Sequence, residues 1–198
     1  MVEDDEVVDW SRTFLSDFHQ ALLQPFVSSR SVVLLVKWQS PIVGRVKMNS
    51  DTVLNLEEQL VGIGVCHSKS SEQVLGSSWQ SFSAALSPAI VVVGAIHRGL
   101  IFASKLGVVL GSIESDATAL VDLINCREPS FTDIGLVVKD IHCCLLGFHG
   151  CKVSFIPRAA NSVAHGPAKL ALSSRDISFL IDDVPPWVES LVLADMLR

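Results

Sequence analysis

Three consecutive strand-like runs near the middle of the chain restrict its fold most strongly. They cover residues 45–52, 59–68 and 74–84, and only short connections separate them. Strands joined by such short loops pair side by side in opposite directions, so an antiparallel meander is expected. A sheet that begins in this way needs later elements to cover its faces.

The first of these runs alternates between two kinds of side chain. Val46, Met48 and Ser50 fall on one face of the predicted strand, and the other face receives Lys47, Asn49 and Asp51. Because neighbouring side chains of a strand point to opposite faces, the pattern predicts two chemically different sides.

After the meander, the pattern changes to alternating helices and strands. Residues 87–107 are predicted to form a helix, since Ser87 can cap it, Pro88 suits its first position and Gly107 suits its end. The β-branched residues 90–93 would also suit a strand, but the length and the caps favour the helix. Further strands are predicted at 108–115 and 151–158, and further helices at 116–126, 130–150 and 159–176. This order predicts an α/β fold with a mixed sheet and helices on both faces.

The two ends of the chain are predicted to lie outside this domain. Residues 1–37 combine an acidic tail, an amphipathic helix over 10–23 and a linker. The domain is expected to cover 38–175, and 176–198 to form a tail with a short helix after a Pro-Pro break.

The composition limits the class of protein. Hydrophobic residues make up 49% and charged residues 18% of the chain, and the mean hydropathy is +0.44. A membrane-spanning helix needs roughly 20 uninterrupted apolar residues, whereas the most apolar window, 87–113, contains His97, Arg98 and Lys105. The acidic N-terminus lacks the order of a signal peptide, so we expect an intracellular protein without a membrane segment. The net charge of −6 gives no global basic signal, so any nucleic-acid role must rest on a local site.

Two aspartates occupy comparable places in the predicted sheet. Asp51 lies in the first strand, and Asp116 directly follows the strand 108–115. Strand ends and helix starts line the functional crevice of α/β sheets, so these acids could meet there. Carboxylates at close range repel one another, and such a pair usually needs a cation, with Mg²⁺ or Mn²⁺ favoured by hard oxygen ligands. Each acid also has a simpler explanation, because Asp116 could cap the following helix and Asp51 could be an exposed strand residue.

Five short motifs follow one another between Trp38 and Ala171. In chain order they are W.SP..G..KMNSD, GIGV, SPAI...GAI..GL..A...G, IESDATALV.LI and IPRAANSVAHGPAKLAL. In order and spacing, the chain resembles the ribonuclease H-like domain of plants, which occurs alone or at the end of retrotransposon reverse transcriptases. The resemblance implies a five-stranded sheet of order 3-2-1-4-5, in which Asp51 and Asp116 lie on neighbouring strands.

The resemblance also implies an activity and its residues. Active members cleave the RNA strand of an RNA–DNA hybrid with two metal ions roughly 4 Å apart, held by an Asp, a Glu, a second Asp and a final Asp or His. Three of these positions correspond to Asp51, Asp116 and His165, which the resemblance marks as catalytic, with the two aspartates as Mg²⁺ or Mn²⁺ ligands. Arg158 and Asn161 are candidates for contacts with the nucleic-acid backbone, although Arg158 could equally pair with an acid and Asn161 could cap the last helix.

The Glu of the family is missing from this sequence. The family pattern S-P-x-x-A-E-A-x-A-I-x-x-G-L aligns without a gap on residues 87–100 and places Val92 at the Glu position. Valine can neither ligate a metal nor accept a proton, and the neutral imidazole of His165 is a poor Mg²⁺ ligand. Glu114 is the nearest spare acid, and we expect its side chain to face away from that of Asp116.

Three functions remain open from the sequence. The first is a diverged ribonuclease H-like domain that binds nucleic acid but has weak or no nuclease activity, because loss of a main metal ligand should cost roughly a thousandfold or more in rate. The second is an active hybrid ribonuclease in which His165 and another acid compensate. The third is a non-catalytic protein-interaction remnant that docks through the helices at 10–23 and 187–197, a reading that the acidic pI of about 5.4 favours.

Overall fold

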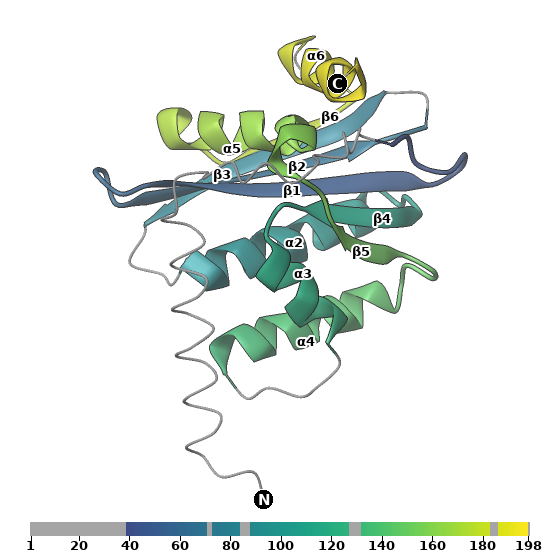
Figure 1. The fold of residues 1–198 in the computed structure, drawn as a ribbon, viewed down its shortest axis with the longest axis horizontal. Helices are drawn as coiled ribbons and strands as arrows, with labels where there is room; N and C mark the ends of the chain where they lie inside the picture. Colours follow the sequence, from purple (N-terminus) through teal and green to yellow (C-terminus); the bar gives the residue numbers. More distant parts are fainter. Residues whose placement is uncertain (1–38, 71–72, 84–87, 127–131, 183–185, 198) are drawn as a thin grey trace, which may run out of the picture.

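A mixed sheet with helices on both faces forms the described part of the chain (Figure 1). The computed structural model describes residues 39–197, without 71–72, 84–87, 127–131 and 183–185. The predicted helix at 10–23 and the capping role of Ser87 lie outside the described residues.

The meander forms as predicted. Strands β1 (Val46–Asn55), β2 (Leu60–Ser68) and β3 (Val74–Ser83) pair antiparallel in that order. Strand β4 (Leu110–Ser115) pairs parallel with β1, and β5 (Lys152–Phe155) pairs parallel with β4. These pairings confirm the expected order 3-2-1-4-5.

A sixth strand, which was not predicted, extends the sheet beyond β3. Strand β6 (Ser178–Ile181) pairs antiparallel with β3 and gives the full order β5-β4-β1-β2-β3-β6. The predicted short helix follows as α6 (Pro186–Leu197). The segment expected to be a tail therefore contributes one strand and one helix to the fold.

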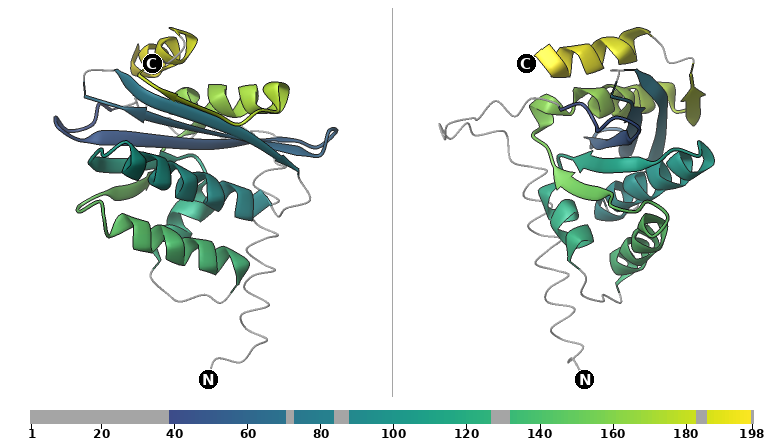
Figure 2. Two further views of the ribbon diagram at one scale, coloured as in Figure 1. Left: turned by 180° about the vertical axis from the view of Figure 1, so that it is seen from behind. Right: turned by 90° about the vertical axis from the view of Figure 1, so that its right-hand side faces the viewer.

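The helices divide between the two faces of the sheet. Helix α2 (Pro88–Lys105), α3 (Thr118–Asn125) and α4 (Asp133–Leu145) lie on one side, and α5 (Ser162–Ser174) and α6 lie on the other (Figures 1 and 2). A short 3-10 helix, η1 (Arg158–Ala160), leads from β5 into α5. Gly107 follows α2 with φ of +64°, a conformation that glycine adopts without strain, as expected for the end of this helix. None of the helices in the described residues has the length and hydrophobicity needed to cross a membrane.

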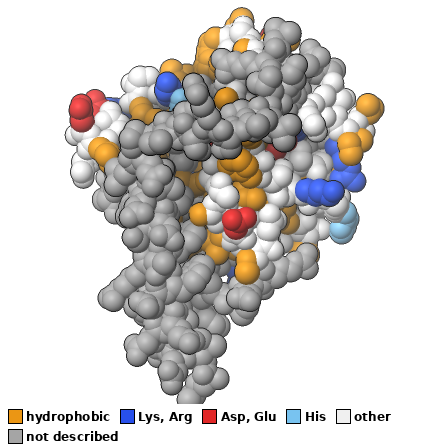
Figure 3. All heavy atoms as spheres, viewed as in Figure 1, with side chains coloured by type: hydrophobic (Ala, Val, Ile, Leu, Met, Phe, Trp, Pro, Cys, Tyr) orange, Lys and Arg blue, Asp and Glu red, His pale blue; other side chains and the backbone are white. Residues whose placement is uncertain are grey.

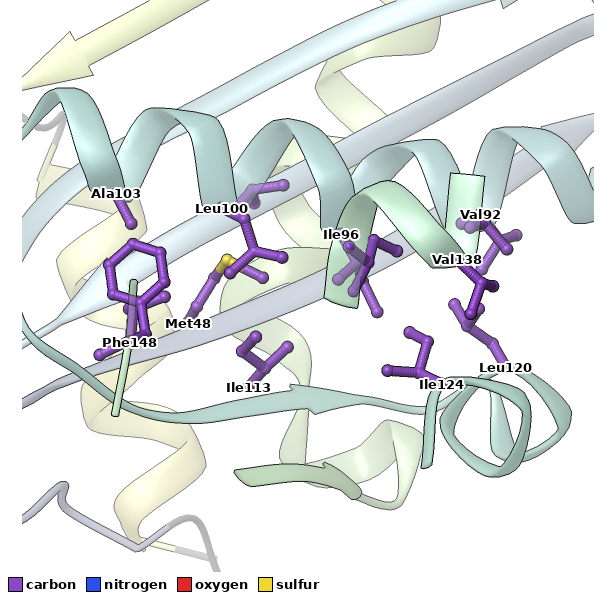
Figure 4. Packing of buried hydrophobic residues seen from close by; sticks show 14 of the residues in the cluster. Met48, Val92, Ile96, Leu100, Ala103, Ile113, Leu120, Ile124, Val138 and Phe148 are labelled. Atoms are coloured by element: carbon purple, nitrogen blue, oxygen red, sulfur yellow. The ribbon is translucent and has the colours of Figure 1, made fainter. Parts of the chain in front are cut away.

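The larger apolar core lies between the sheet and α2. Met48, Ile96, Leu100 and Ile113 are completely buried there (Figure 4). Helix α2 approaches β1 closely because position 99 is glycine: a Cβ there would lie 2.6 Å from Met48 Sδ. This packing confirms that Val46 and Met48 share the apolar face of the first strand.

Helix α5 lies unusually close to the opposite face. A Cβ at Gly62 would lie 2.2 Å from Ala168 O, and one at Gly64 would lie 2.3 Å from Ala164 O. The backbone of α5 therefore rests directly on β2, and this contact fixes where the first turn of α5 lies relative to β1.

Candidate active site

The polar face of β1 lies underneath α5. Its three polar side chains are almost inaccessible to solvent, with exposures of 3% for Lys47, 0% for Asn49 and 4% for Asp51. Buried polar groups need hydrogen-bond or charge partners, and these come from β4, from the segment after it and from α5.

Asp51 and Asp116 meet, as the strand order predicts. The parallel register places Ser50 of β1 opposite Ser115 of β4, so the next residue of each strand reaches the same place. Burial raises the pKa of Asp116 from 3.8 to about 7, and the charge of Asp51 and a side-chain hydrogen bond with Asp51 act in the same direction. The nearby guanidinium of Arg158 opposes this rise in pKa. Burial and the neighbouring carboxylate therefore both disfavour the charged form of Asp116.

Both simpler explanations of these acids are wrong. The N-cap residue of α3 is Ala117, and its backbone N–H donates to Ser115 Oγ, so Asp116 does not cap the helix. Asp51 is buried rather than exposed.

His165 contacts the same aspartate from the first turn of α5. Its Nδ1 lies 2.6 Å from Asp51 Oδ2, and the backbone N–H of Thr52 donates to Asp51 Oδ1 at 2.7 Å. Arg158 Nη2 lies 3.3 Å from the same imidazole nitrogen. One nitrogen cannot donate to Asp51 and accept from Arg158 at once, so we assign its proton to the shorter contact with Asp51. In the neutral ring, Nε2 then carries no proton.

Arg158 and Asn161 have different surroundings. Arg158 is exposed beside the Asp51–Asp116 pair, where a ligand can reach it. Asn161 is completely buried and occupies the N-cap position of α5, but its side chain makes no capping hydrogen bond. Instead, Asn161 Nδ2 donates to the backbone oxygen of Ser50 at 3.1 Å, and Asn161 Oδ1 accepts from Asn49 Nδ2 at 3.1 Å.

The side chain of Glu114 does not face away from Asp116, contrary to expectation. Residues two apart in a strand point to the same face, and Glu114 accordingly points toward the polar row of β1. Its Oε1 lies 2.6 Å from Lys47 Nζ, and its Oε2 accepts from Asn49 Nδ2 at 3.2 Å. Glu114 is thus engaged by Lys47 and Asn49 rather than spare. The row Lys47, Asn49, Asp51 in an otherwise apolar chain was the signal that could have revealed this network.

Val92 lies in the apolar core. Its side chain is 4% exposed and belongs to the same buried cluster as Leu120, Ile124 and Val138 (Figure 4). The position that the resemblance assigns to a Glu is therefore lined by hydrocarbon in this protein.

The donor set does not fit a pair of metal ions. Two carboxylates meet, and the two oxygens of Asp51 already contact the backbone N–H of Thr52 and the imidazole of His165. The described residues contain no group of three or more His, Cys, Asp or Glu side chains that could hold a metal ion. Two bridged Mg²⁺ ions need more anionic oxygen ligands than this arrangement supplies.

Comparisons with known proteins agree with this architecture. Residues 49–171 match the family described as reverse transcriptase-like. No match was found among curated proteins. The structure is similar to the N-terminal RNase H domain of Rv2228c from Mycobacterium tuberculosis, with a TM-score of 0.59 and 20% identity over 66% of this chain and 95% of that one.

Two further solved structures are similar at the same level. RNase H1 from the halophilic archaeon Halobacterium salinarum NRC-1 gives a TM-score of 0.56 and 21% identity, and covers 66% of this chain and 99% of its own. LC11-RNase H1, solved in complex with an RNA/DNA hybrid, gives a TM-score of 0.58 and 14% identity, and the similarity covers 66% of this chain and 98% of that one. The family match covers more than half of the chain, and the similarity extends over at least 95% of each of these three solved structures. This chain therefore belongs to the reverse transcriptase-like family and has the ribonuclease H-like fold.

Proposed function

We propose that this chain is a nucleic-acid-binding ribonuclease H-like domain whose hydrolytic activity is weak or lost. One observation carries the proposal: Asp51, Asp116 and His165 meet in one site, while Val92 is buried among apolar side chains. The site thus retains part of the arrangement implied by the resemblance and lacks one anionic group.

The retained residues support binding of an RNA–DNA hybrid. Arg158 is exposed beside the aspartate pair, and Arg is well suited to hold a phosphate oxygen through its guanidinium. A structurally similar protein, LC11-RNase H1, was solved with such a hybrid. The Lys and Arg side chains of the described residues do not form one continuous basic surface on the face seen in Figure 3. We therefore expect modest affinity that falls with increasing salt.

The missing acid supports weak or absent hydrolysis. A main ligand of a two-metal centre contributes several kcal/mol to transition-state stabilisation, or roughly a thousandfold in rate. The side chains that remain in the site bind and orient, and Asp51 and Asp116 supply two carboxylates where the resemblance implies a third at the position of Val92.

A labelled RNA–DNA hybrid tests both parts of the proposal. Binding is measured at low and at moderate salt for the wild type and for Arg158→Gln, and cleavage is measured with added Mg²⁺ or Mn²⁺ for the wild type, Asp51→Asn and Val92→Glu. Val92→Gln is the matched control, because it has the size of Glu without the charge.

We expect the wild type to bind the hybrid, Arg158→Gln to bind it more weakly, and the wild type to show little or no cleavage. Cleavage that Asp51→Asn abolishes would overturn the loss of activity. Absence of salt-dependent binding would overturn the nucleic-acid role.

A second candidate function is favoured by helix α6. This helix packs on α5 with Val188 and Val192 fully buried, yet Trp187 and Leu193 remain 39% and 49% exposed. A protein partner could cover these two side chains if they lie in one contiguous apolar patch. If α6 docks another copy of the chain, sedimentation velocity would show self-association that Leu193→Lys removes.

A further inference from the structure

A buried charged and amide network lies next to the candidate active site. It links Lys47 and Asn49 of β1 to Glu114 of β4 and to Asn161 at the start of α5. Lys47 and Glu114 are only 3% and 14% exposed, and both asparagines are fully buried. The network thus joins the three elements that position the site: β1 carries Asp51, β4 ends directly before Asp116, and α5 carries His165.

This network stabilises the fold less than apolar side chains of similar size would. A buried ion pair rarely stabilises a protein more than apolar residues of similar volume would, because both charges must be removed from water. Asn49 Oδ1 is also buried without a hydrogen-bond partner, which adds a desolvation penalty. The face of the same sheet under α2 shows that this chain can fill such positions with hydrocarbon.

The geometry of Asn161 shows what the network can do. An asparagine at an N-cap ordinarily accepts a hydrogen bond from the first turn of its own helix. Asn161 makes no such bond, and its side chain is held by Ser50 O and by Asn49 of β1. Its backbone oxygen accepts the N–H of His165 at 3.1 Å. Asn161 therefore connects the strand that carries Asp51 directly to the residue that contacts Asp51.

The ion pair acts at the other end of the same chain of contacts. Glu114 orients Asn49 through Oε2, and Lys47 holds Glu114 through Oε1 while also donating to the backbone oxygen of Gln39. Because Glu114 is two residues before Asp116, the pair also fixes the end of β4 against β1.

We propose that Lys47, Glu114, Asn49 and Asn161 are positioning residues, which hold β4 and α5 against β1 so that Asp116 and His165 both meet Asp51. This inference rests on the proposed function in assuming that the site binds a ligand. It adds that a polar network holds Asp51, Asp116 and His165 in place, and that this network stabilises the fold less than apolar residues would.

The test replaces the ion pair by apolar residues of similar size, Lys47→Met with Glu114→Leu. The matched control is Arg175→Met with Glu58→Leu, since this pair also joins α5 to the β1–β2 hairpin, at 3.2 Å, but is 66% and 49% exposed. Thermal unfolding reports stability. The ¹⁵N shifts of the His165 ring at alkaline pH report its tautomer without any ligand, and hybrid binding is measured separately.

In the wild type and in the control, we expect His165 to carry its proton on Nδ1, toward Asp51. In the buried-pair variant, we expect the thermal midpoint to stay within about 4 °C of the wild type or to rise, while the Nδ1–H tautomer gives way to a mixture. Affinity for the hybrid should fall about fivefold or more. A stable variant with an unchanged tautomer would overturn the inference.

A second variant covers the case in which the double replacement does not fold. Asn161→Ala removes both links to β1 but keeps the backbone contact with His165. We expect the same change of tautomer, and an unchanged tautomer in a folded Asn161→Ala protein would also overturn the inference. Because the tautomer is measured in the free protein, a wild type that fails to bind the hybrid would count against the proposed function alone.

Discussion

The two faces of the central sheet are built from different chemistry. Under α2, the sheet buries a continuous apolar cluster that includes Met48, Ile96 and Leu100. Under α5, the same strand β1 buries a lysine, an asparagine and an aspartate, each with a polar contact to β4, α5 or the segment after β4. In β1, Val46 and Met48 pack in the apolar cluster on one face of the sheet. The alternate residues Lys47, Asn49 and Asp51 form the polar contacts of the candidate site on the other face.

The two faces also differ in how far they match the site that the resemblance implies. The residues implied by the resemblance on the α5 face and after β4 are present and in contact. At the position in α2 to which the resemblance assigns an acid, this chain has Val92, which belongs to the apolar cluster of that side. Val92 thus belongs to the hydrocarbon core and not to the polar network, so stability and site chemistry should respond separately to mutation.

The largest expected effect comes from the apolar face. Leu100 is completely buried between α2 and the sheet, so Leu100→Ala removes buried hydrocarbon and leaves a cavity. We expect the free energy of unfolding to fall by about 3–4 kcal/mol, as measured by urea denaturation. The tautomer of His165 should not change in the folded variant. A change there would mean that the two faces do not act separately.

The second expected effect is a response to pH that has opposite sign on the two faces. On the α2 face, burial lowers the pKa of His67 from 6.5 to about 4, against the smaller opposing effect of its contact with Gly99 O. The unfolded state binds this proton more readily, so His67 contributes stability that is complete above pH 6.5 and is lost as the pH falls toward 4. The full difference is about 3 kcal/mol.

On the α5 face the sign reverses. The pKa of Asp116 is raised from 3.8 to about 7, so the folded state binds the proton more readily. Its contribution to stability is greatest below about pH 4 and is lost as the pH rises toward 7, by at most about 4 kcal/mol. Between pH 4 and 6.5 the two groups therefore oppose one another.

Two variants separate these contributions in urea denaturation at pH 4.5, 5.5 and 6.5, a range chosen to span roughly this window. Asp116→Asn removes the contribution to stability that decreases with rising pH, so the free energy of unfolding should rise with pH more steeply than in the wild type. His67→Leu removes the contribution to stability that increases with rising pH. The free energy of unfolding of this variant, compared with that of the wild type at the same pH, should therefore decrease as the pH rises. Parallel curves for the two variants and the wild type would show that neither group is perturbed by its surroundings.

Much of the fold could be predicted from sequence because its signals are local. The alternation in 45–52 predicted the two faces of β1, and Pro88 and Gly107 marked the limits of α2. Strand β6 was missed because four residues after a helix carry little periodic signal, and its pairing with β3 depends on contacts across more than 90 positions of sequence.

The candidate site was harder to predict, because it depends on which side chains meet. The approach of Asp51 and Asp116 followed from the strand order, but that order came from the resemblance to a family rather than from the residues. The pairing of Glu114 with Lys47, and the use of Asn161 against β1 instead of as a cap, depend on the register of β4 and on the depth of α5. Local patterns contain neither quantity.

The smallest expected effects come from substitutions at two glycines, one in β2 beneath α5 and one in α2. A Cβ at Gly64 would lie 2.3 Å from Ala164 O and 2.4 Å from Ala168 N, both backbone atoms of α5, which cannot move singly. Gly64→Ala must therefore lift α5 from β2, and we expect a loss of about 2 kcal/mol together with a changed His165 tautomer. A Cβ at Gly94 in α2 would meet nothing within 4 Å, so Gly94→Ala should stabilise the protein by about 0.8 kcal/mol through helix propensity alone. Urea denaturation of the two variants measures both changes. Equal and small effects would mean that α5 is not held as closely to the sheet as the positions of Gly62 and Gly64 indicate.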